Sequence, residues 1–250
     1  MGNDPQGCPG TCSYNTAHHL LKAHAKAYHL YNSKFKAQFK GKVSISISAD
    51  WMEPGSNKKE NIEAAERAQQ FQLGWFAHPI YSLQGDYPSI MKTTIARRSK
   101  TEGLKTSRLP NFSLEELREI KGSFDFFALN FYTSSQCFDR TDKKIHDQSW
   151  VADAEVTQNQ SAHWPSSSAD WLKFTPWAMR KILKWIKANY NNPPVFITEN
   201  GWADNNGFLS DTWRINFIKH YVNNILQAIK IDNCNVIGYT HWSLLDNFEW

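Results

Sequence analysis

The sequence predicts an α/β protein built on a parallel sheet, and three observations support this fold class. Segments with helical periodicity alternate with strand-like segments along the whole chain, helix then strand, four times over. The run at 195–197 is short, continuous and apolar, which is typical of a strand buried on both faces of a parallel sheet. No two successive strands read as a hairpin, so we expect right-handed crossovers through helices to connect them.

The composition restricts the class of protein. Of the 250 residues, 41% are hydrophobic and 21% are charged, as in an ordinary globular chain. The net charge of +4 comes with lysines scattered along helices, which indicates a solvated surface and no nucleic-acid footprint. No run of about 18 apolar residues occurs, so we expect no membrane span in this chain. Two N-x-S sequons, at Asn111 and Asn159, leave the compartment open.

The four cysteines predict no metal site. Cys8 and Cys12 bracket a Pro-Gly turn and could close a small disulfide loop, but they lack partners at zinc spacing. Cys234 precedes an apolar strand and is predicted to be a buried thiol. Cys137 has no assigned role.

The first helix and the first strand are predicted from their periodicity. The helix covers 14–39, and on its apolar stripe His24 is expected to be a hydrogen-bonded core histidine, not a metal ligand. The segment 43–54 alternates strictly between apolar and small polar residues and is predicted as one strand, with its serines facing a crowded interior. The predicted stripe of the helix consists of Leu20, Ala27, Tyr31, Phe35 and Phe39.

Three further helices have recognisable starts. Asn57 with Glu60 and Ser113 with Glu116 are spaced as capping boxes. Thr175-Pro176 reads as the N-cap and first residue of a helix. That helix is expected to bury Met179, Leu183 and Ile186, and a last helix over 211–231 is expected to bury Ile218, Val222, Ile225 and Ile229.

Polar residues gather where predicted strands end. The strand at 124–132 ends in Asn130 and Tyr132, and the strand at 195–197 leads into Glu199. In a parallel (β/α) fold these ends meet on one face, where a supported Glu can act as a nucleophile or a base. The same Glu could instead cap the next helix or pair with an Arg. A polar stretch at 134–169 reads as one long structureless loop, which is often functional.

Two motifs carry a family resemblance. I-T-E-N-G at 197–201 and W-S-L-L-D-N-F-E-W at 242–250 resemble glycoside hydrolase family 1, the retaining β-glucosidases and their relatives, and the second motif is long and very specific. The resemblance implies a (β/α)8 TIM barrel of which this chain supplies only strands five to eight and their helices. Residues 1–250 are then the C-terminal part of a single TIM-barrel domain.

The resemblance also assigns residues to roles. Glu199 matches the family's catalytic nucleophile, and Tyr132 matches the tyrosine that hydrogen-bonds it. The family's acid/base Glu lies in an Asn-Glu-Pro segment, which this sequence lacks; Glu53, in Met-Glu-Pro, is on another strand and is read as structural support. The residues that match sugar-binding positions are Asn130, Trp171, Trp242, Glu249 and Trp250.

The function implied by the resemblance is hydrolysis of β-glucosides or β-galactosides by double displacement, without a cofactor or a metal. The partner is then a small carbohydrate or glycoside, and activity needs the missing N-terminal half of the barrel. A catalytically inactive, klotho-like binding module and a myrosinase-like thioglucosidase are the alternatives. Retention of Glu199 favours an enzyme, since a binding module needs no nucleophile.

Overall fold

The computed structural model describes residues 10–140, 148–204, 207, 209–245 and 247. The chain divides into two compact units. Unit 1 comprises Met1–Ile45, Met52–Asp125 and Gln136–Asn159. Unit 2 comprises Ser46–Trp51, Phe126–Ser135 and Gln160–Trp250.

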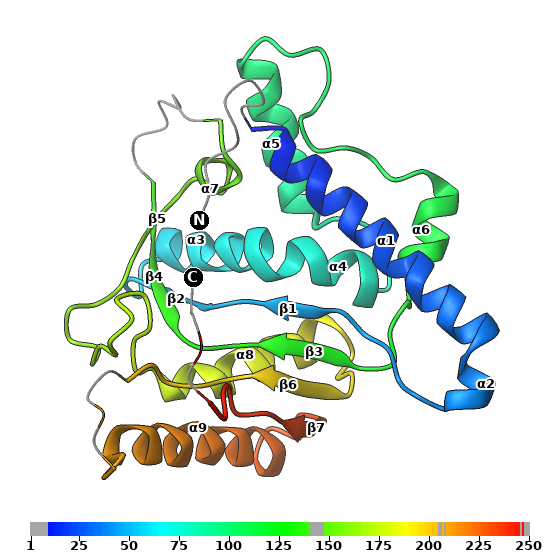
Figure 1. Ribbon diagram of the computed structural model, residues 1–250. Coiled ribbons are helices and arrows are strands. Elements are labelled where there is room, and N and C mark those ends of the chain that lie inside the picture. Colours follow the sequence, from blue (N-terminus) through cyan, green and yellow to red (C-terminus); the bar gives the residue numbers. More distant parts are fainter. Residues whose placement is uncertain (1–9, 141–147, 205–206, 208, 246, 248–250) are drawn as a thin grey trace. The chain divides into compact units, whose positions relative to one another are not determined.

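Unit 2 contains a four-stranded parallel sheet, as the sequence predicts. Its strands lie in the order β1-β3-β6-β7 (Figure 1), and each pairs in parallel with its neighbour. Helices separate them along the chain, so the α/β class is confirmed. The strands are β1 (Ser46–Ser48), β3 (Phe127–Asn130), β6 (Val195–Glu199) and β7 (Val236–Tyr239).

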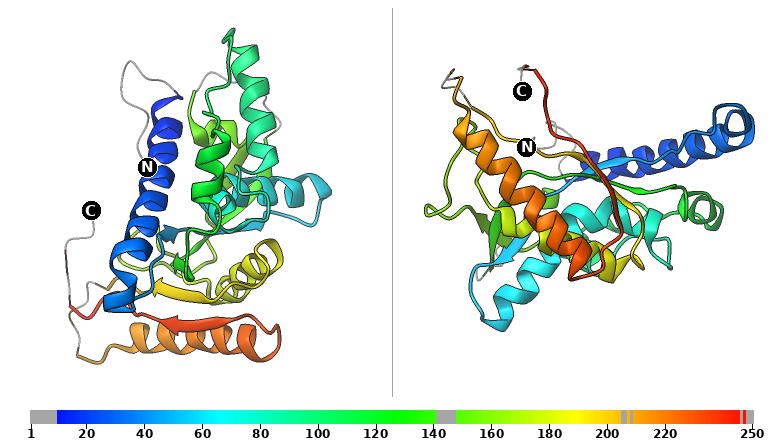
Figure 2. Two further views of the ribbon diagram at one scale, coloured as in Figure 1. Left: turned by 90° about the vertical axis from the view of Figure 1, so that its right-hand side faces the viewer. Right: turned by 90° about the horizontal axis from the view of Figure 1, so that it is seen from below.

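Helices α8 (Pro176–Asn189) and α9 (Thr212–Lys230) complete unit 2. They pack on each other, and α9 lies alongside β7 in all views (Figures 1 and 2). Pro176 occupies the first turn of α8 as predicted, but the Thr175 side chain makes no cap bond and accepts one from Ser134 Oγ at 3.0 Å instead. The predicted core residues of α8 are buried: Met179, Leu183 and Ile186.

The predicted buried face of α9 is confirmed at Ile225 and wrong at Val222. Phe217, Tyr221, Ile225 and Ala228 are buried, whereas Val222 is exposed. The cause is aromatic packing: the rings of Phe217 and Tyr221 stack with centroids 4.0 Å apart, and Tyr221 also lies 6.5 Å from Phe131 of the sheet. Two aromatic rings bury more apolar area than the β-branched residues beside them, so they set the rotation of the helix.

Unit 1 is mostly helical. The first helix ends at Lys34, before a second short helix, and its buried side consists of Tyr14, Ala17, His18, Leu21 and Ala25. The predicted stripe is wrong, because Leu20, Phe35 and Phe39 are exposed. His24 is half-buried and bonds the Ser123 carbonyl at 2.7 Å, as expected of a core histidine. The helices are α1 (Cys12–Lys34), α2 (Lys36–Phe39), α3 (Lys59–Gln69), the π-helix η1 (Gln70–Gly74), α4 (Trp75–Tyr81), α5 (Ser89–Thr101) and α6 (Leu114–Ile120).

The two predicted capping boxes have different outcomes. At α6, Ser113 Oγ accepts from Glu116 N and the Glu116 carboxylate accepts from Ser113 N, so this box is confirmed. At α3 the N-cap is Lys58 with no side-chain cap, so the box predicted from Asn57 and Glu60 is wrong. Local spacing permits a capping box but does not decide where the chain turns into the helix.

The predicted strand over 43–54 is two strands. β1 ends at Ser48 and β2 (Trp51–Pro54) begins three residues later. β2 belongs to a second sheet, of order β2-β4-β5, with β4 (Ser134–Asp139) and β5 (Val156–Asn159). Strict alternation shows that the side chains have the period of a strand, but it does not show where the chain passes from one sheet to another.

The segment 134–169 is not structureless, which corrects the loop predicted there. It contains β4, the short helix α7 (Trp150–Asp153) and β5. β4 and β5 pair in an antiparallel ladder, from Gln136 opposite Asn159 to Asp139 opposite Val156. The expectation that all strands are parallel is therefore also wrong, because β4 and β5 are largely polar and contain no apolar run to detect.

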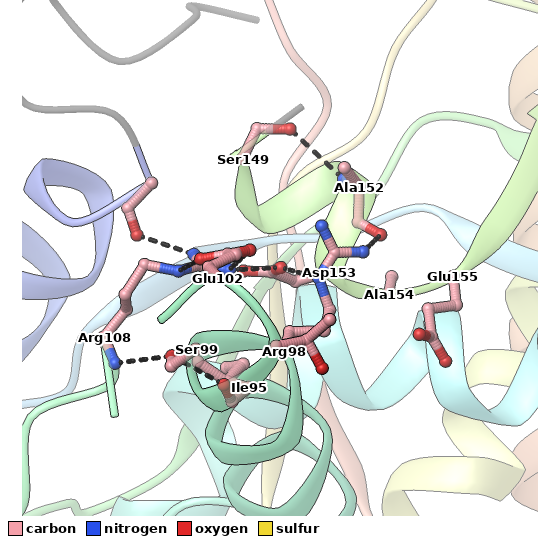
Figure 3. Close-up of polar contacts among 12 residues, drawn as sticks. Ile95, Arg98, Ser99, Glu102, Arg108, Ser149, Ala152, Asp153, Ala154 and Glu155 are labelled. Carbon is pink, nitrogen blue, oxygen red and sulfur yellow. Dashed lines mark hydrogen bonds and ion pairs between the residues drawn. The ribbon is translucent and has the colours of Figure 1, made fainter. Parts of the chain in front are cut away.

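A buried ionic cluster holds α7 in unit 1 (Figure 3). The Asp153 carboxylate is fully buried and pairs with Arg98 Nε at 2.5 Å and with Arg108 at 2.6 and 2.7 Å. Tyr14 donates its hydroxyl to the same carboxylate at 2.6 Å, and Glu102 accepts from Arg108 Nε at 2.9 Å. Burial and the Asp153 charge raise the pKa of Tyr14, so its phenol stays a neutral donor.

The cysteines agree with the sequence where the structure describes them. Cys137 and Cys234 are free, buried thiols, as predicted for Cys234. Burial raises the pKa of the Cys137 thiol to about 12, so it is not a reactive thiolate. Cys12 is disulfide-bonded, and Cys8, its predicted partner, lies outside the described residues.

Candidate active site

A β-bulge shapes the ends of β3 and β6 in unit 2. Leu129 is opposite Ile197, but Asn130 is opposite Glu199, so Thr198 is the extra residue. In a regular strand Thr198 and Glu199 would point to opposite faces. The bulge allows both to reach β3: Thr198 Oγ1 donates to Asn130 Oδ1 at 2.6 Å, and Glu199 contacts Tyr132, two residues further along.

The Glu199 carboxylate accepts a hydrogen bond from the Tyr132 hydroxyl. The distance from Tyr132 Oη to Glu199 Oε2 is 2.8 Å. Glu199 is half-buried, so one side of the carboxylate is held and the group stays within reach of a ligand. The two residues that the sequence proposes as the catalytic pair are therefore in direct contact. A charge-assisted bond of this kind fixes the direction of the carboxylate.

Asn130 precedes Tyr132 along the chain and Trp171 follows it, and both side chains are placed by their neighbours. Asn130 is held through Thr198, whose Oγ1 also accepts from Ser46 Oγ at 3.3 Å. The Trp171 ring meets the Tyr132 ring edge-on, with centroids 5.7 Å apart at 82°, and is 51% exposed. An indole that is packed on one edge and open on the other can contact a ligand beside Tyr132.

Two side chains attach the Trp171 segment to the end of β3. Thr133 Oγ1 accepts from Lys173 N at 3.0 Å and donates to Lys173 O at 3.1 Å. Gln160 Nε2 donates to Trp171 O at 2.7 Å and to Ser134 O at 3.2 Å. Neither Thr133 nor Gln160 is singled out by the sequence, because their partners lie 11 to 40 positions away.

Trp242 lies just beyond β7 and is 40% exposed. Its backbone N donates to Asn200 O at 2.9 Å, and its own carbonyl approaches Gly201 so closely that a Cβ there would be 1.7 Å away. Gly201 of the I-T-E-N-G motif is therefore required by close backbone approach. The peptide bond between Trp242 and Ser243 is cis. Glu249 and Trp250 lie outside the described residues.

No metal centre accompanies this site in the part of the chain that the structure describes. There, no group of three or more His, Cys, Asp or Glu side chains is placed to hold a metal ion. Among the same residues, no helix combines the length and the apolarity that a membrane span needs. What the site offers is a carboxylate, a phenol, an amide and two exposed indoles, which are groups that contact neutral polar ligands.

The fold and the site thus define a parallel α/β protein with a tyrosine-held carboxylate at the C-terminal ends of its strands. The model of glycosyl hydrolase family 1 matches residues 2–250. The chain belongs to this family, and its resemblance in sequence is confirmed.

Similar proteins agree with this membership. The chain is 46% identical to rat (Rattus norvegicus) lactase/phlorizin hydrolase over 244 residues, and 42% identical to human (Homo sapiens) cytosolic β-glucosidase over 254 residues. These matches cover 97% and 100% of this chain. A solved structure of an aphid myrosinase superposes with a TM-score of 0.87 at 44% identity, over 96% of this chain. Family 1 β-glucosidases have the TIM-barrel fold.

The chain is much shorter than these relatives. It spans 53% of the cytosolic β-glucosidase, 51% of the aphid myrosinase and 12% of lactase/phlorizin hydrolase. The activity of a whole family 1 protein is therefore treated below as a proposal for this chain.

Proposed function

We propose that this chain forms part of a retaining β-glycosidase of the β-glucosidase or β-galactosidase type, which needs no cofactor. The observation that carries the proposal is the 2.8 Å hydrogen bond from Tyr132 to Glu199 at the strand ends of a family 1 chain. Glu199 is the nucleophile, and Tyr132 orients it. Family membership supports a carbohydrate or glycoside as the substrate.

Double displacement needs two carboxyl groups about 5–5.5 Å apart. Glu199 attacks the anomeric carbon while the second group protonates the leaving oxygen; water then hydrolyses the glycosyl-enzyme, with the second group acting as base. The second group is the Glu of an Asn-Glu-Pro segment, which this sequence does not contain. We assign it to a segment upstream of this chain.

Sugar binding is assigned to groups around Glu199. Asn130 hydrogen-bonds the same sugar, Trp242 lies beneath the glycone ring, and Trp171 borders the leaving-group side. Glu249 accepts from two sugar hydroxyls and Trp250 donates to another. Hydrogen bonds and an aromatic face position a neutral sugar without charge steering. The exposed indoles of Trp171 and Trp242 support these roles.

We further propose that the four parallel strands are strands five to eight of a (β/α)8 barrel, so that residues 1–250 form the C-terminal part of one domain. In the described part of the chain, β1 and β7 each pair with a single neighbour in this sheet, which leaves two edges for further strands. Leu244 and Leu245 are 95% and 77% exposed, as expected of apolar residues whose cover is missing. This chain joined to upstream strands one to four is called the completed protein below.

A thioglucosidase is a second candidate, favoured by the likeness to the aphid myrosinase. The substrate of such an enzyme carries a better leaving group, so the enzyme dispenses with the acid/base Glu. An inactive binding module is disfavoured by the retained Glu199 and its bond to Tyr132. The upstream coding sequence separates the three: an Asn-Glu-Pro segment supports the O-glycosidase, and a replaced Glu supports the other two.

The test follows the product of the completed protein by NMR during hydrolysis of a β-glucoside. A retaining mechanism releases the β-anomer first, because two displacements restore the starting configuration. Glu199→Gln, which is nearly isosteric, should remove turnover and leave the circular dichroism spectrum unchanged. Release of the α-anomer first, or full activity of Glu199→Gln, would contradict the proposal.

A further inference from the structure

Asn200, the residue after the proposed nucleophile, follows directly on β6 and contacts the ends of both neighbouring strands, β3 and β7. Its side chain is fully buried. The amide Nδ2 donates to Phe131 O at 2.8 Å, the amide Oδ1 accepts from Tyr239 Oη at 3.0 Å, and the backbone carbonyl accepts from Trp242 N at 2.9 Å. The name "Asn200 clamp" is used for these three hydrogen bonds.

We propose that Asn200, held by Tyr239, is a positioning residue that sets the distance between Glu199 and Tyr132. The inference rests on the proposed function, since it assigns the supports of that same site. Asn200 and Tyr239 do not touch the substrate in this proposal. They act through the backbone of the residues that do.

The clamp continues the pairing of β3 and β6 beyond the bulge. Phe131 N donates to Glu199 O at 2.9 Å, and Phe131 O accepts from the Asn200 side chain. Both polar groups of the Phe131 backbone are thus bound to consecutive residues of the β6 end. Because Phe131 precedes Tyr132 and Glu199 precedes Asn200, these two bonds fix the register in which the phenol meets the carboxylate.

The chemistry of the clamp requires an amide at position 200. One partner, the Phe131 carbonyl, needs a donor, and the other, the Tyr239 hydroxyl, needs an acceptor. An amide supplies both, whereas a carboxylate supplies acceptors alone and would face the carbonyl with its charge. Burial raises the pKa of Tyr239 to about 12, which keeps the phenol protonated as the donor that Asn200 needs.

Tyr239 also connects the Asn200 side chain to β7. It is the last residue of that strand, and Trp242 follows it by three positions. The adjacent Thr240 N donates to Ile197 O at 2.8 Å, so β7 is held to β6 both before and after Tyr239. Loss of the Tyr239 hydroxyl should therefore leave the sheet paired and loosen only the Asn200 side chain.

The experiment compares Tyr239→Phe and Asn200→Asp in the completed protein. The readouts are the first-order rate constant of trapping by a 2-fluoro glycoside and, separately, the number of sites that are trapped at completion. We expect Tyr239→Phe to slow trapping about 10-fold and Asn200→Asp about 100-fold, because small displacements of a reacting group cost that much. Substrate affinity should change by no more than about twofold, since no sugar contact is removed.

Tyr190→Phe is the matched control, because Tyr190 is a buried tyrosine of unit 2 that packs on Phe127 and Trp185, away from the clamp. It should leave the trapping rate unchanged. The double variant of positions 200 and 239 should lose no more than Asn200→Asp alone, because both changes break one unit.

A purely structural role for Asn200 predicts fewer trappable sites with an unchanged rate at each, and that result would overturn the inference. If Asn200→Asp does not fold, Tyr239→Phe decides the matter, since it removes one hydroxyl. Absence of trapping in the unaltered completed protein would contradict the proposed nucleophile itself. If the unaltered completed protein is trapped and Tyr239→Phe is trapped at the same rate, the proposed positioning role of the Asn200 clamp is contradicted and the proposed nucleophile is not.

Discussion

Replacing Asp153 by Asn should destabilise unit 1 strongly, although Asp153 has no part in the proposed chemistry. The substitution keeps the shape of the side chain and removes its charge. Arg98 and Arg108 then lose the carboxylate that both of them contact (Figure 3). Tyr14 loses a charged acceptor.

The size of the effect follows from burial. The Arg98 and Arg108 side chains are 1% and 2% exposed, so neither guanidinium can turn to water. Glu102 still offsets the charge of Arg108, at 2.9 Å, whereas the buried Arg98 guanidinium loses the carboxylate with which it is paired. Removing one member of a buried ion pair costs about 3–5 kcal/mol. We expect a loss of this order in the free energy of unfolding.

The assay is urea unfolding of the completed protein, followed by tryptophan fluorescence. Glu155→Gln is the control, since it is also a change from carboxylate to amide, two residues away. Its partner Arg97 is 54% exposed, and such a pair contributes at most about 1 kcal/mol. A loss at Asp153→Asn no larger than at Glu155→Gln would refute the reasoning, because it would mean that the cluster is hydrated or replaceable.

Three further predictions concern the site. Tyr132→Phe removes a bond to a carboxylate and should lower kcat about 10- to 100-fold at nearly constant KM; an unchanged kcat would show that the 2.8 Å contact is not used. Glu249→Ala should lower kcat/KM by about 10- to 100-fold on natural sugars and far less on an activated aryl glycoside of a deoxy sugar, and equal losses would make Glu249 structural. The 250-residue chain alone should hydrolyse neither activated nor unactivated β-glucosides and should recover on mixing with strands one to four. The chain alone lacks half of the barrel and also lacks general acid assistance, which raises the rate about 10²–10⁴-fold. Turnover of an unactivated glucoside by the chain alone would contradict this prediction.

The sequence predicts the parts of this protein whose signals are local. The parallel strands are apolar runs with polar residues at their ends, and Ser113 with Glu116 lies within one turn of the helix that it caps. The pairing of Tyr132 with Glu199 is predicted by the family resemblance alone. The direct contact exists because parallel strands bring their C-terminal ends to one edge.

Contacts between distant residues could not be predicted in this way. Asp153 lies in a polar stretch without periodicity, and its partner Tyr14 is 139 positions away. The Asn200 side chain stands in a recognised motif, but its role depends on Tyr239, 39 positions further on. The bulge at Thr198 could not be predicted, because the continuous apolar run at 195–197 has no alternation that an inserted residue would interrupt. These features needed the three-dimensional arrangement.

The central claim, that Glu199 is the nucleophile of a retaining glycosidase, is tested most directly by labelling. The completed protein is incubated with a 2-fluoro glycoside, which accumulates as a covalent glycosyl-enzyme, and its peptides are mapped by mass spectrometry. The account predicts one adduct, on the peptide that contains Glu199, and none in Glu199→Gln. An adduct on any other carboxylate would contradict it.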